Sequence, residues 1–501
     1  MKFAVLADLH LPDRDDTVKE KVFDCALEMI SRRRADAVLC VGDMIMNNAV
    51  EAAKRVKNKI AALNIPVVYA CGNTENAALQ TVEIFRNENL SNIDKTVCAV
   101  FPTEKNFSEN EYALTLEKVK ASESAIIISH YFPRHFSEVD KNRLAYLLTA
   151  NENVIFIAGH EHYDRIDGVY HVVRGIDPDK AIGGMPAAAF FEYDEEKRCF
   201  KRENAEIDLR TSDNAKLQEF VSFLGISGMH ETLKNFEYAV LNKIASFEMR
   251  HTAVADLPFA GLAEVIEKWR KVGGRHLSMH MPDIVRNSET AEIDLKSAED
   301  VAELAVKLGC DRLTVHVPKC SVETLSNAEC RQKMLDAYAL ICSKVLRHDI
   351  SVGIENMHMT SKDTPDEKRR FGYTPQECRE WIEDLRRICR SDKIGFHFDI
   401  GHARNNAPFS AQYAVSTWFA ELGKYINGYH LHQVKVGENG KFLNHQAITE
   451  PFGALISYAS FYLAWQTEQI AHAPIFIETS LNADVSYDIL KNNFLNGNCH
   501  E

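Results

Sequence analysis

The sequence of 501 residues lacks the features that mark membrane and secreted proteins. No stretch approaches the roughly 18 to 20 uninterrupted apolar residues that a membrane-spanning helix needs. The first apolar run, Phe3–Ala7, is too short for a secretion signal and is followed by the carboxylate of Asp8. The 12 cysteines are scattered and include no Cys-x-x-Cys pair, unlike those of small disulfide-rich domains. We therefore expect a soluble, cytoplasmic protein without a membrane partner.

Positive charge is also scarce. The 58 Lys and Arg residues are outnumbered by 72 Asp and Glu residues, which gives a net charge of −14. Such a surface repels the phosphate backbone that dominates affinity for DNA and RNA, so we expect long nucleic acid not to be a partner. The hydrophobic fraction of 46% is close to the globular average and predicts a folded core. A chain of this length exceeds one typical domain, and two or three domains are expected.

The first two hundred residues alternate short apolar runs with helical patterns. Apolar runs of this kind are typical of buried parallel strands, which carry functional groups to one edge of a sheet. Closing strands are expected at Ala187–Tyr193 and Lys201–Leu209, and the polar stretch Thr211–Lys216 marks the predicted boundary between a domain of residues 1–212 and one of residues 216–501. The earlier runs, each followed by Asp, Asn or His, are Phe3–Ala7, Ala37–Val41, Val67–Ala70, Ala125–Ser129 and Val154–Ala158.

From Phe220 onward a strand–helix rhythm can be counted through eight units. Eight such units over roughly 280 residues are the length and rhythm of a TIM barrel, in which the active site lies at the C-terminal ends of the strands. Amphipathic stretches such as Leu262–Lys271, Ala298–Leu308 and Glu377–Cys389 separate the strands. The strands are predicted at Phe223–Met229, Ala245–Met249, His276–His280, Leu313–Val317, Ser351–Glu355, Ile394–Asp399, Ile426–His430 and Ile475–Glu478.

Oxygen and imidazole side chains follow the N-terminal strands in a fixed order. Asp, His and Asn suit hard or borderline divalent cations better than thiolates do. A bridging carboxylate lets two such cations lie about 3.5 to 4 Å apart, polarise a phosphoryl oxygen and activate water for in-line attack. The set is Asp8-Leu9-His10, Gly42-Asp43, Gly72-Asn73, His130 and Gly159-His160-Glu161-His162.

These motifs, in this order, resemble those of the calcineurin-type metallophosphoesterases. The resemblance implies an α/β sandwich that hydrolyses a phosphomonoester or phosphodiester with two divalent ions (Mn, Fe, Zn, Ni or Mg). The sequence departs from the pattern at Thr74, where many members carry a His that can protonate the leaving group; a Thr hydroxyl is no strong acid near neutral pH. The implied ligands are Asp8, His10, Asp43 and His162 on one ion and Asp43, Asn73, His130 and His160 on the other, with Asp43 bridging.

A second set of ionisable residues falls at the ends of the predicted barrel strands. Two glutamates, one aspartate and several histidines at one barrel mouth would be a large uncompensated charge without a divalent cation. The set contains His280, His316, Glu355, Asp399, His402, His430, His432, His445 and Glu478.

This second set resembles the site of the xylose-isomerase-like TIM barrels, which include sugar isomerases and epimerases and the endonuclease IV enzymes. The resemblance implies one or two divalent ions (Mn, Zn or Co) on the quartet Glu355, Asp399, His430 and Glu478. In the epimerases the two glutamates also move the proton beside a substrate carbonyl, and His280 and His316 match further ligands of the endonuclease branch. His402 and His445 match part of a third metal set. The expected catalytic residues are Glu355, Glu478 and His402.

The barrel sequence is compatible with several functions. Leu443 and Gln433 stand where endonuclease relatives carry Asp, which favours a sugar or sugar-phosphate isomerase or epimerase over a nuclease; a lyase, a scaffold or a sensor without turnover are further alternatives. The substrate is expected to be a small phosphorylated metabolite or nucleotide. No pattern indicates the oligomeric state. His432 of this set and three other histidines, His251, His358 and His397, are expected to pack or to support ligands.

Overall fold

In the computed structural model the described residues are 1–86, 89–102, 107–207, 214–287, 290, 292–360, 362–438 and 442–495. The chain divides into two compact units. One unit contains Met1–Leu209 together with Phe452–Leu463, and the other contains Arg210–Pro451 together with Ala464–Glu501. Part of the polar stretch Thr211–Lys216 lies outside the described residues, so the domain boundary placed there stays a prediction.

The first unit is built on two sheets, with strand orders β11-β10-β1-β2-β3 and β4-β5-β6-β7-β9-β8. Their facing sides share one buried core that contains Phe3 and Leu39 of one sheet and Ile126 and Ile157 of the other, which confirms the predicted α/β sandwich. The strands are β1 (Lys2–Leu6), β2 (Ala37–Cys40), β3 (Val67–Tyr69), β4 (Leu90–Ile93), β5 (Thr96–Val100), β6 (Ser124–Ser129), β7 (Val154–Ala158), β8 (Arg165–Asp167), β9 (Tyr170–Val172), β10 (Ala187–Asp194) and β11 (Cys199–Glu206).

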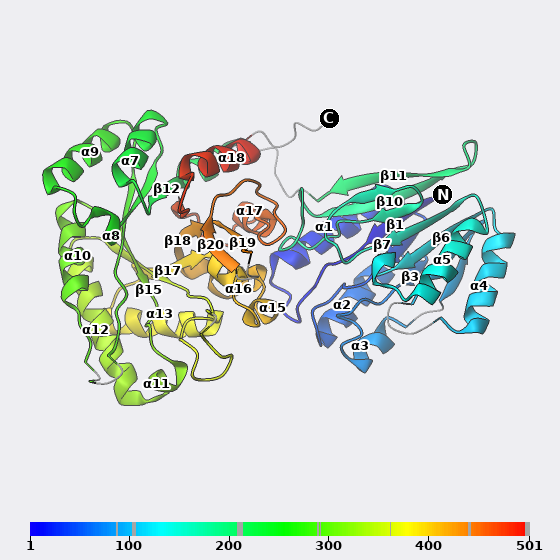
Figure 1. The fold of residues 1–501 in the computed structure, drawn as a ribbon, viewed down its shortest axis with the longest axis horizontal. Coiled ribbons are helices and arrows are strands. Elements are labelled where there is room, and N and C mark those ends of the chain that lie inside the picture. The colour runs from blue at the N-terminus through cyan, green and yellow to red at the C-terminus, as the bar shows by residue number, and fades with distance from the viewer. Residues whose placement is uncertain are drawn as a thin grey trace. The chain divides into compact units, whose positions relative to one another are not determined.

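Helices cover the outer faces of these sheets (Figure 1). Val119 and Leu147, from two of the helices, share a second core with Ile127 and Phe156 on the outer side of β6 and β7. Strands β1, β2 and β3 are parallel to one another, as are β5, β6 and β7, so each set ends at one edge of its sheet. The helices are α1 (Val18–Arg32), α2 (Val50–Ala61), α3 (Leu79–Ile84), α4 (Glu109–Ala121) and α5 (Glu138–Thr149), with a short 3-10 turn at Pro133–His135.

The second unit is a closed barrel of eight parallel strands, as predicted. The pairing of Leu224 with Ile475 joins the first and last strands and closes the barrel. A hairpin of β19 (Gln433–Val436) and β20 (Phe442–Gln446), which the sequence pattern did not predict, follows the seventh strand. The barrel strands are β12 (Leu224–Gly228), β13 (Ser246–Arg250), β14 (His276–His280), β15 (Arg312–His316), β16 (Ser351–Glu355), β17 (Ile394–Asp399), β18 (Ile426–Leu431) and β21 (Ile475–Ile477).

The predicted amphipathic stretches form helices, and Figure 1 shows α9, α10 and α12 on the outside of the barrel strands. In the described part of the chain, no helix combines the length and apolar character needed to cross a bilayer. The helices that begin in this part of the sequence are α6 (Asn214–Phe223), α7 (Thr232–Leu241), α8 (His251–Val254), α9 (Phe259–Lys271), α10 (Lys296–Lys307), α11 (Val322–Ser326), α12 (Ala328–Leu346), α13 (Pro375–Cys389), α14 (Ile400–Arg404), α15 (Phe409–Gln412), α16 (Val415–Leu422), α17 (Ala459–Gln466) and α18 (Ala483–Leu495).

Gly274 is required by the packing of Trp269 against the outside of the barrel. A Cβ atom at Gly274 would lie 2.2 Å from the Trp269 ring, which is fully buried and donates a hydrogen bond to the Ile244 carbonyl at 2.7 Å. We expect Gly274→Ala to lower the free energy of unfolding by about 1–3 kcal/mol through overpacking. Urea unfolding followed by tryptophan fluorescence measures this, because all 4 tryptophans lie in the barrel unit.

Gly261→Ala is the matched control for Gly274→Ala. Gly261 lies inside α9, and a Cβ atom there would meet no atom within 4 Å. We expect this substitution to stabilise the helix by up to about 1 kcal/mol, since alanine is the better helix former. Identical unfolding midpoints for the two variants would show that Trp269 is not held as tightly as its contacts indicate.

Candidate metal centres

The predicted ligands of the first unit sit on unusual backbone. Five of them have a positive φ: Asp8 (52°), His10 (48°), Asp43 (52°), His160 (70°) and His162 (58°). Residues other than glycine rarely adopt this region, and it persists where surrounding structure imposes it, typically at functional sites. Each of these residues follows a strand, so the tight turns direct their side chains to one edge of the unit.

The loop that contains Asp43 and the loop that contains Gly72 approach each other closely, which explains the glycine in Gly72-Asn73. A Cβ atom at Gly72 would lie 2.2 Å from the Oδ1 atom of Asp43. The two loops are joined by Glu75, which is buried and accepts backbone N–H bonds from Asp43 at 2.8 Å, Met44 at 2.6 Å and Gly72 at 2.7 Å. Sequence reasoning missed Glu75, because its three backbone partners become apparent only in the folded chain.

The seven predicted ligands of the first unit come together around Asp43. Its Oδ2 atom is 3.2 Å from His10 Nε2 and 3.3 Å from His130 Nε2, so one carboxylate oxygen faces both halves of the site. Asn73 Oδ1 is 3.3 Å from His130 Nε2. Two groups, Asp8–His10–His162 and Asp43–His130–His160, each place their ligand atoms within 4.8 Å of one another. This is the arrangement expected of a bridging carboxylate between two ions.

The electrostatics of this cluster fit divalent cations. Burial raises the pKa of Asp8 to about 7, and the nearby His130 and His10 offset this effect only in part. Burial also acts to raise the pKa of Asp43, but hydrogen bonds and charge from His10 and His130 hold it well below its ordinary value. The Nδ1 atom of His162 is buried and has no hydrogen-bond partner among the described residues. A metal ion would satisfy both deficits.

A buried ion pair, which no sequence motif indicated, orients His10. Its Nδ1 atom lies 3.1 Å from Asp177 Oδ2, and the other oxygen of Asp177 lies 2.8 Å from Lys19 Nζ. Lys19 is 1% exposed, so this pair is isolated from water. A carboxylate on one ring nitrogen directs the opposite nitrogen of a ligating histidine toward the metal. Asp177 therefore supports the contact between His10 and Asp43.

In the barrel, Glu355 lies between two groups of side chains. Its Oε2 atom is 3.2 Å from His280 Nε2 and 3.4 Å from His316 Nε2. Its Oε1 atom is 3.2 Å from His430 Nδ1, which also lies 3.4 Å from Glu478 Oε2 and 3.9 Å from Asp399 Oδ2. The predicted quartet and the two further histidines thus meet around one glutamate.

Buried atoms of this group face one another without forming hydrogen bonds. Glu355 Oε2, His280 Nε2 and Asp399 Oδ2 all lack a hydrogen-bond partner within the described ranges, although each is close to other polar atoms. Buried polar atoms normally find such partners. Carboxylate and imidazole atoms that converge in this way fit a divalent metal site, with Glu355 shared between two positions.

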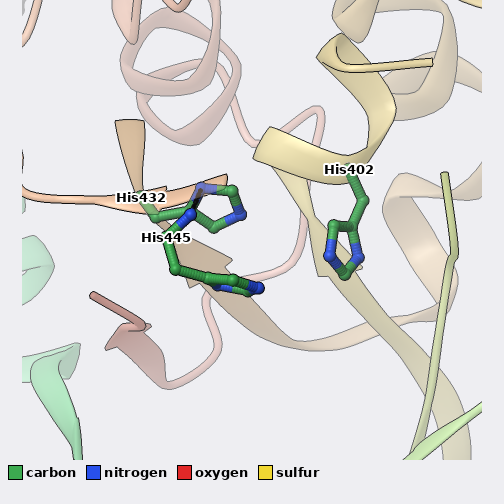
Figure 2. A group of neighbouring side chains, drawn as sticks. All are labelled: His402, His432 and His445. Atoms are coloured by element: carbon green, nitrogen blue, oxygen red, sulfur yellow. Dashed lines mark hydrogen bonds between the residues drawn. The ribbon is translucent and has the colours of Figure 1, made fainter. Parts of the chain in front are cut away.

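Three further histidines form a group that adjoins the quartet (Figure 2). His432 and His445 lie side by side with ring centroids 4.5 Å apart, and His402 on α14 faces them with centroids at 5.9 and 5.7 Å. His432 Nε2 is also 3.2 Å from Asp399 Oδ1. Sequence reasoning treated His432 as a supporting residue and noted the missing Asp at Leu443. In the structure His432 is the third member of this group. Leu443 lies on the hairpin and is 47% exposed.

The remaining residues named from the sequence hold or flank these groups. His251 Nδ1 lies 3.2 Å from the carbonyl of His280, His358 Nε2 lies 2.8 Å from Asn444 Nδ2, and His397 Nδ1 lies 3.2 Å from Arg312 Nη2. Gln433 Nε2 donates to the Glu450 carbonyl at 3.1 Å.

Three charged residues that contact the barrel ligands were missed by sequence reasoning. Arg250 donates to Glu478 Oε1 at 2.8 Å, Asp283 lies 2.6 Å from His316 Nδ1, and Glu248 lies 2.6 Å from His430 Nε2. Alternation along β13 could have revealed Glu248 and Arg250, because residues two apart share one face of a strand and Phe247 and Met249 face the other way.

Two family models match the chain in the order described above. The model of the calcineurin-like phosphoesterase superfamily domain matches residues 1–178, and the model of the xylose isomerase-like TIM barrel matches residues 244–484. Among curated proteins, no match to the chain was found.

Solved structures similar to the chain each resemble one part of it. A D-tagatose 3-epimerase-like protein is 19% identical, with 55% of this chain and 97% of that chain covered and a TM-score of 0.41. A xylose isomerase domain protein from Planctomyces limnophilus is 14% identical, with 55% and 97% covered and a TM-score of 0.38. A dimetal phosphatase from Danio rerio is 14% identical, with 38% and 92% covered and a TM-score of 0.31. On the strength of the two family models, the chain carries a calcineurin-like phosphoesterase domain followed by a xylose isomerase-like TIM barrel.

Proposed function

We propose that the protein is a bifunctional, metal-dependent cytoplasmic enzyme whose N-terminal domain hydrolyses a phosphate ester of a small metabolite or nucleotide. One observation carries the first activity: Asp43 Oδ2 lies 3.2 Å from His10 Nε2 and 3.3 Å from His130 Nε2, between two groups of metal-type ligands. Two divalent ions bound there would polarise the phosphoryl oxygen and make water nucleophilic near neutral pH. The chain's acidic balance favours a small substrate over long nucleic acid.

The residues around this centre hold the ligands in place. Thr74, however, does not provide an acid that could protonate the leaving group. The Oγ1 atom of Thr74 donates to Asp43 Oδ1 at 2.9 Å, so its proton is committed to the bridging carboxylate. Both nitrogens of His10 face carboxylates, with Nε2 3.2 Å from Asp43 Oδ2 and Nδ1 3.1 Å from Asp177 Oδ2. His135 also lies nearby, with its ring centroid 5.6 Å from that of His160 and its Nε2 atom 3.3 Å from Glu161 Oε1.

For the barrel we propose metal-dependent isomerisation or epimerisation of a sugar or sugar phosphate. The match to the xylose isomerase-like family supports this function, and Glu355, Asp399, His430 and Glu478 meet at the barrel mouth. In that reaction one glutamate takes the proton from the carbon beside a carbonyl and the other returns it.

Phosphodiester hydrolysis of the endonuclease IV type is the second candidate for the barrel, and a specific observation favours it. The oxygens of both glutamates face cationic or imidazole groups: Glu355 faces His280, His316, His402 and His430, and Glu478 faces Arg250, His430 and His445. Carboxylates held in this way act as ligands more readily than as bases for a carbon-bound proton. The group of His402, His432 and His445 adds a further possible metal position.

The first test of the N-terminal centre is Asp43→Ala. We expect loss of up to two metal ions per chain and loss of phosphoesterase activity, because the variant removes the oxygen that faces both groups. Metal content by elemental analysis and phosphate release from mono- and diesters with added Mn²⁺ measure this. Asp24→Ala, which removes an exposed carboxylate on α1, should change neither quantity. Full activity of the Asp43 variant would contradict a dinuclear centre.

The second test concerns the leaving group. Because Thr74 cannot protonate it, we expect the parent protein to hydrolyse aryl esters at least ten times faster than alkyl esters, as an aryl oxide leaves without a proton. Thr74→His should narrow this ratio and Thr74→Val should not. Initial rates on matched aryl and alkyl phosphates give the comparison. Equal rates in the parent would mean that another group, such as His135 or a water, already supplies the proton.

The third test separates the two barrel reactions. An isomerase or epimerase incubated in D₂O with its substrate places deuterium beside the carbonyl, whereas a hydrolytic barrel leaves carbon-bound hydrogens in place and cleaves phosphodiesters. We expect deuterium incorporation from a panel of sugars and sugar phosphates with Mn²⁺, Co²⁺ or Zn²⁺, and no incision of DNA at an abasic site. Incision that disappears in Glu478→Ala and in His316→Ala would reverse this ranking.

A further inference from the structure

A buried carboxylate lies inside the barrel below the proposed metal site. Glu248 is in the middle of β13 and has no exposed surface. Its Oε1 atom is 2.6 Å from Nε2 of His430, which is also fully buried. β13 and β18 are not neighbours in the barrel, so this contact crosses the barrel interior.

Two hydroxyl groups fix the position of this carboxylate. Ser278 Oγ on β14 and Thr314 Oγ1 on β15 donate to the Oε2 atom of Glu248 at 2.8 and 2.7 Å. Glu248 is therefore tied to three other strands through its two oxygens, and its orientation is determined by the barrel itself. A carboxylate held in this way presents Oε1 to His430 in a defined direction.

The contact determines which nitrogen of His430 carries a proton. An ionised carboxylate only accepts hydrogen bonds, so the Nε2–H group of His430 is the donor and Glu248 Oε1 the acceptor. In the neutral imidazole the lone pair then lies on Nδ1. This is the atom that faces Glu355 Oε1 at 3.2 Å and Glu478 Oε2 at 3.4 Å.

Glu248 is poorly placed to hold a metal ion itself. Glu248, His397 and His430 do bring ligand atoms within 4.8 Å of one another. However, the guanidinium of Arg312 lies 3.2 Å from His397 Nδ1 and is buried, so a second cation in that place would be repelled. Both oxygens of Glu248 are also already occupied by donors.

We propose that Glu248 is a positioning residue that presents Nδ1 of His430 to a divalent cation held with Glu355, Asp399 and Glu478. The inference rests on the proposed barrel metal site but on neither of the two proposed reactions. Carboxylate partners of ligating histidines raise the basicity of the ligand and fix its ring, and their loss typically lowers metal affinity by about 10- to 100-fold.

The test is a double-mutant cycle on Co²⁺ affinity in the full chain. Asp8→Ala and Asp43→Ala are included throughout, so that the N-terminal centre does not compete for the metal. Glu248→Gln should weaken binding by about 10- to 100-fold when His430 is present and by less than about threefold in the His430→Ala background. Competition with a chelating dye gives the affinity, and the visible absorption of Co²⁺ reports the change in its ligands.

Two further variants separate a positioning role from a merely structural one. Glu248→Asp keeps the carboxylate and should restore part of the Co²⁺ affinity lost in Glu248→Gln. Glu264→Gln, which changes an exposed glutamate on α9, should leave the affinity unchanged. Urea unfolding of each metal-free protein checks that all variants are folded at the assay temperature.

Each contrary outcome overturns a different statement. Unchanged affinity in Glu248→Gln, or equal losses with and without His430, would overturn the positioning role. A barrel without affinity for Co²⁺ before Glu248 is changed would instead overturn the proposed metal site, and this inference with it.

Discussion

Both units are organised around carboxylates that are buried against imidazoles at the ends of parallel strands. Asp43 in the first unit and Glu355 in the barrel each place one oxygen within 3.4 Å of two histidine nitrogens. Burying such groups without a compensating cation is costly, because a low-dielectric interior penalises every unpaired charge. The turns, glycines and supporting ion pairs of the two units are the means by which the chain keeps these groups together.

The strands that carry the ligands were predictable from continuous apolar sequences in the first unit and from the repeated strand–helix rhythm in the barrel. Val154–Ala158, His276–His280 and Ile394–Asp399 form strands with the predicted bounds. Except for the buried and largely apolar β5, the strands that were not predicted are short or polar. The hairpin of β19 and β20 is an example, since Gln433–Val436 and Phe442–Gln446 contain polar residues and lie partly on the surface. Their pairing depends on tertiary context, which a local pattern does not contain.

The difference between local pattern and tertiary context also explains why the ligands were predicted and the residues that support them were not. Ligands belong to short motifs whose spacing follows from one strand and one turn, as in Asp8-Leu9-His10. Asp177 and Glu248 support His10 and His430 from distant parts of the sequence, so only the folded chain reveals their partners. His432 shows why motif comparison at single positions was not sufficient. The sequence pattern pointed to residue 443 for the third ligand of the group with His402 and His445, but in the fold His432 lies at that place.

The two centres also hold their ligands by different means. In the first unit the backbone itself is strained, with positive φ at five ligand positions, so the ligand geometry is built into the turns. In the barrel the quartet follows regular strands and is oriented by side chains from the interior, such as Glu248. The group of three histidines departs from this plan, because His445 has a φ of 54° on the hairpin and donates its backbone N–H to His432 Nδ1 at 3.1 Å. His445 Nδ1 also lies 3.2 Å from Glu478 Oε2, so the hairpin joins the group of three histidines to the quartet.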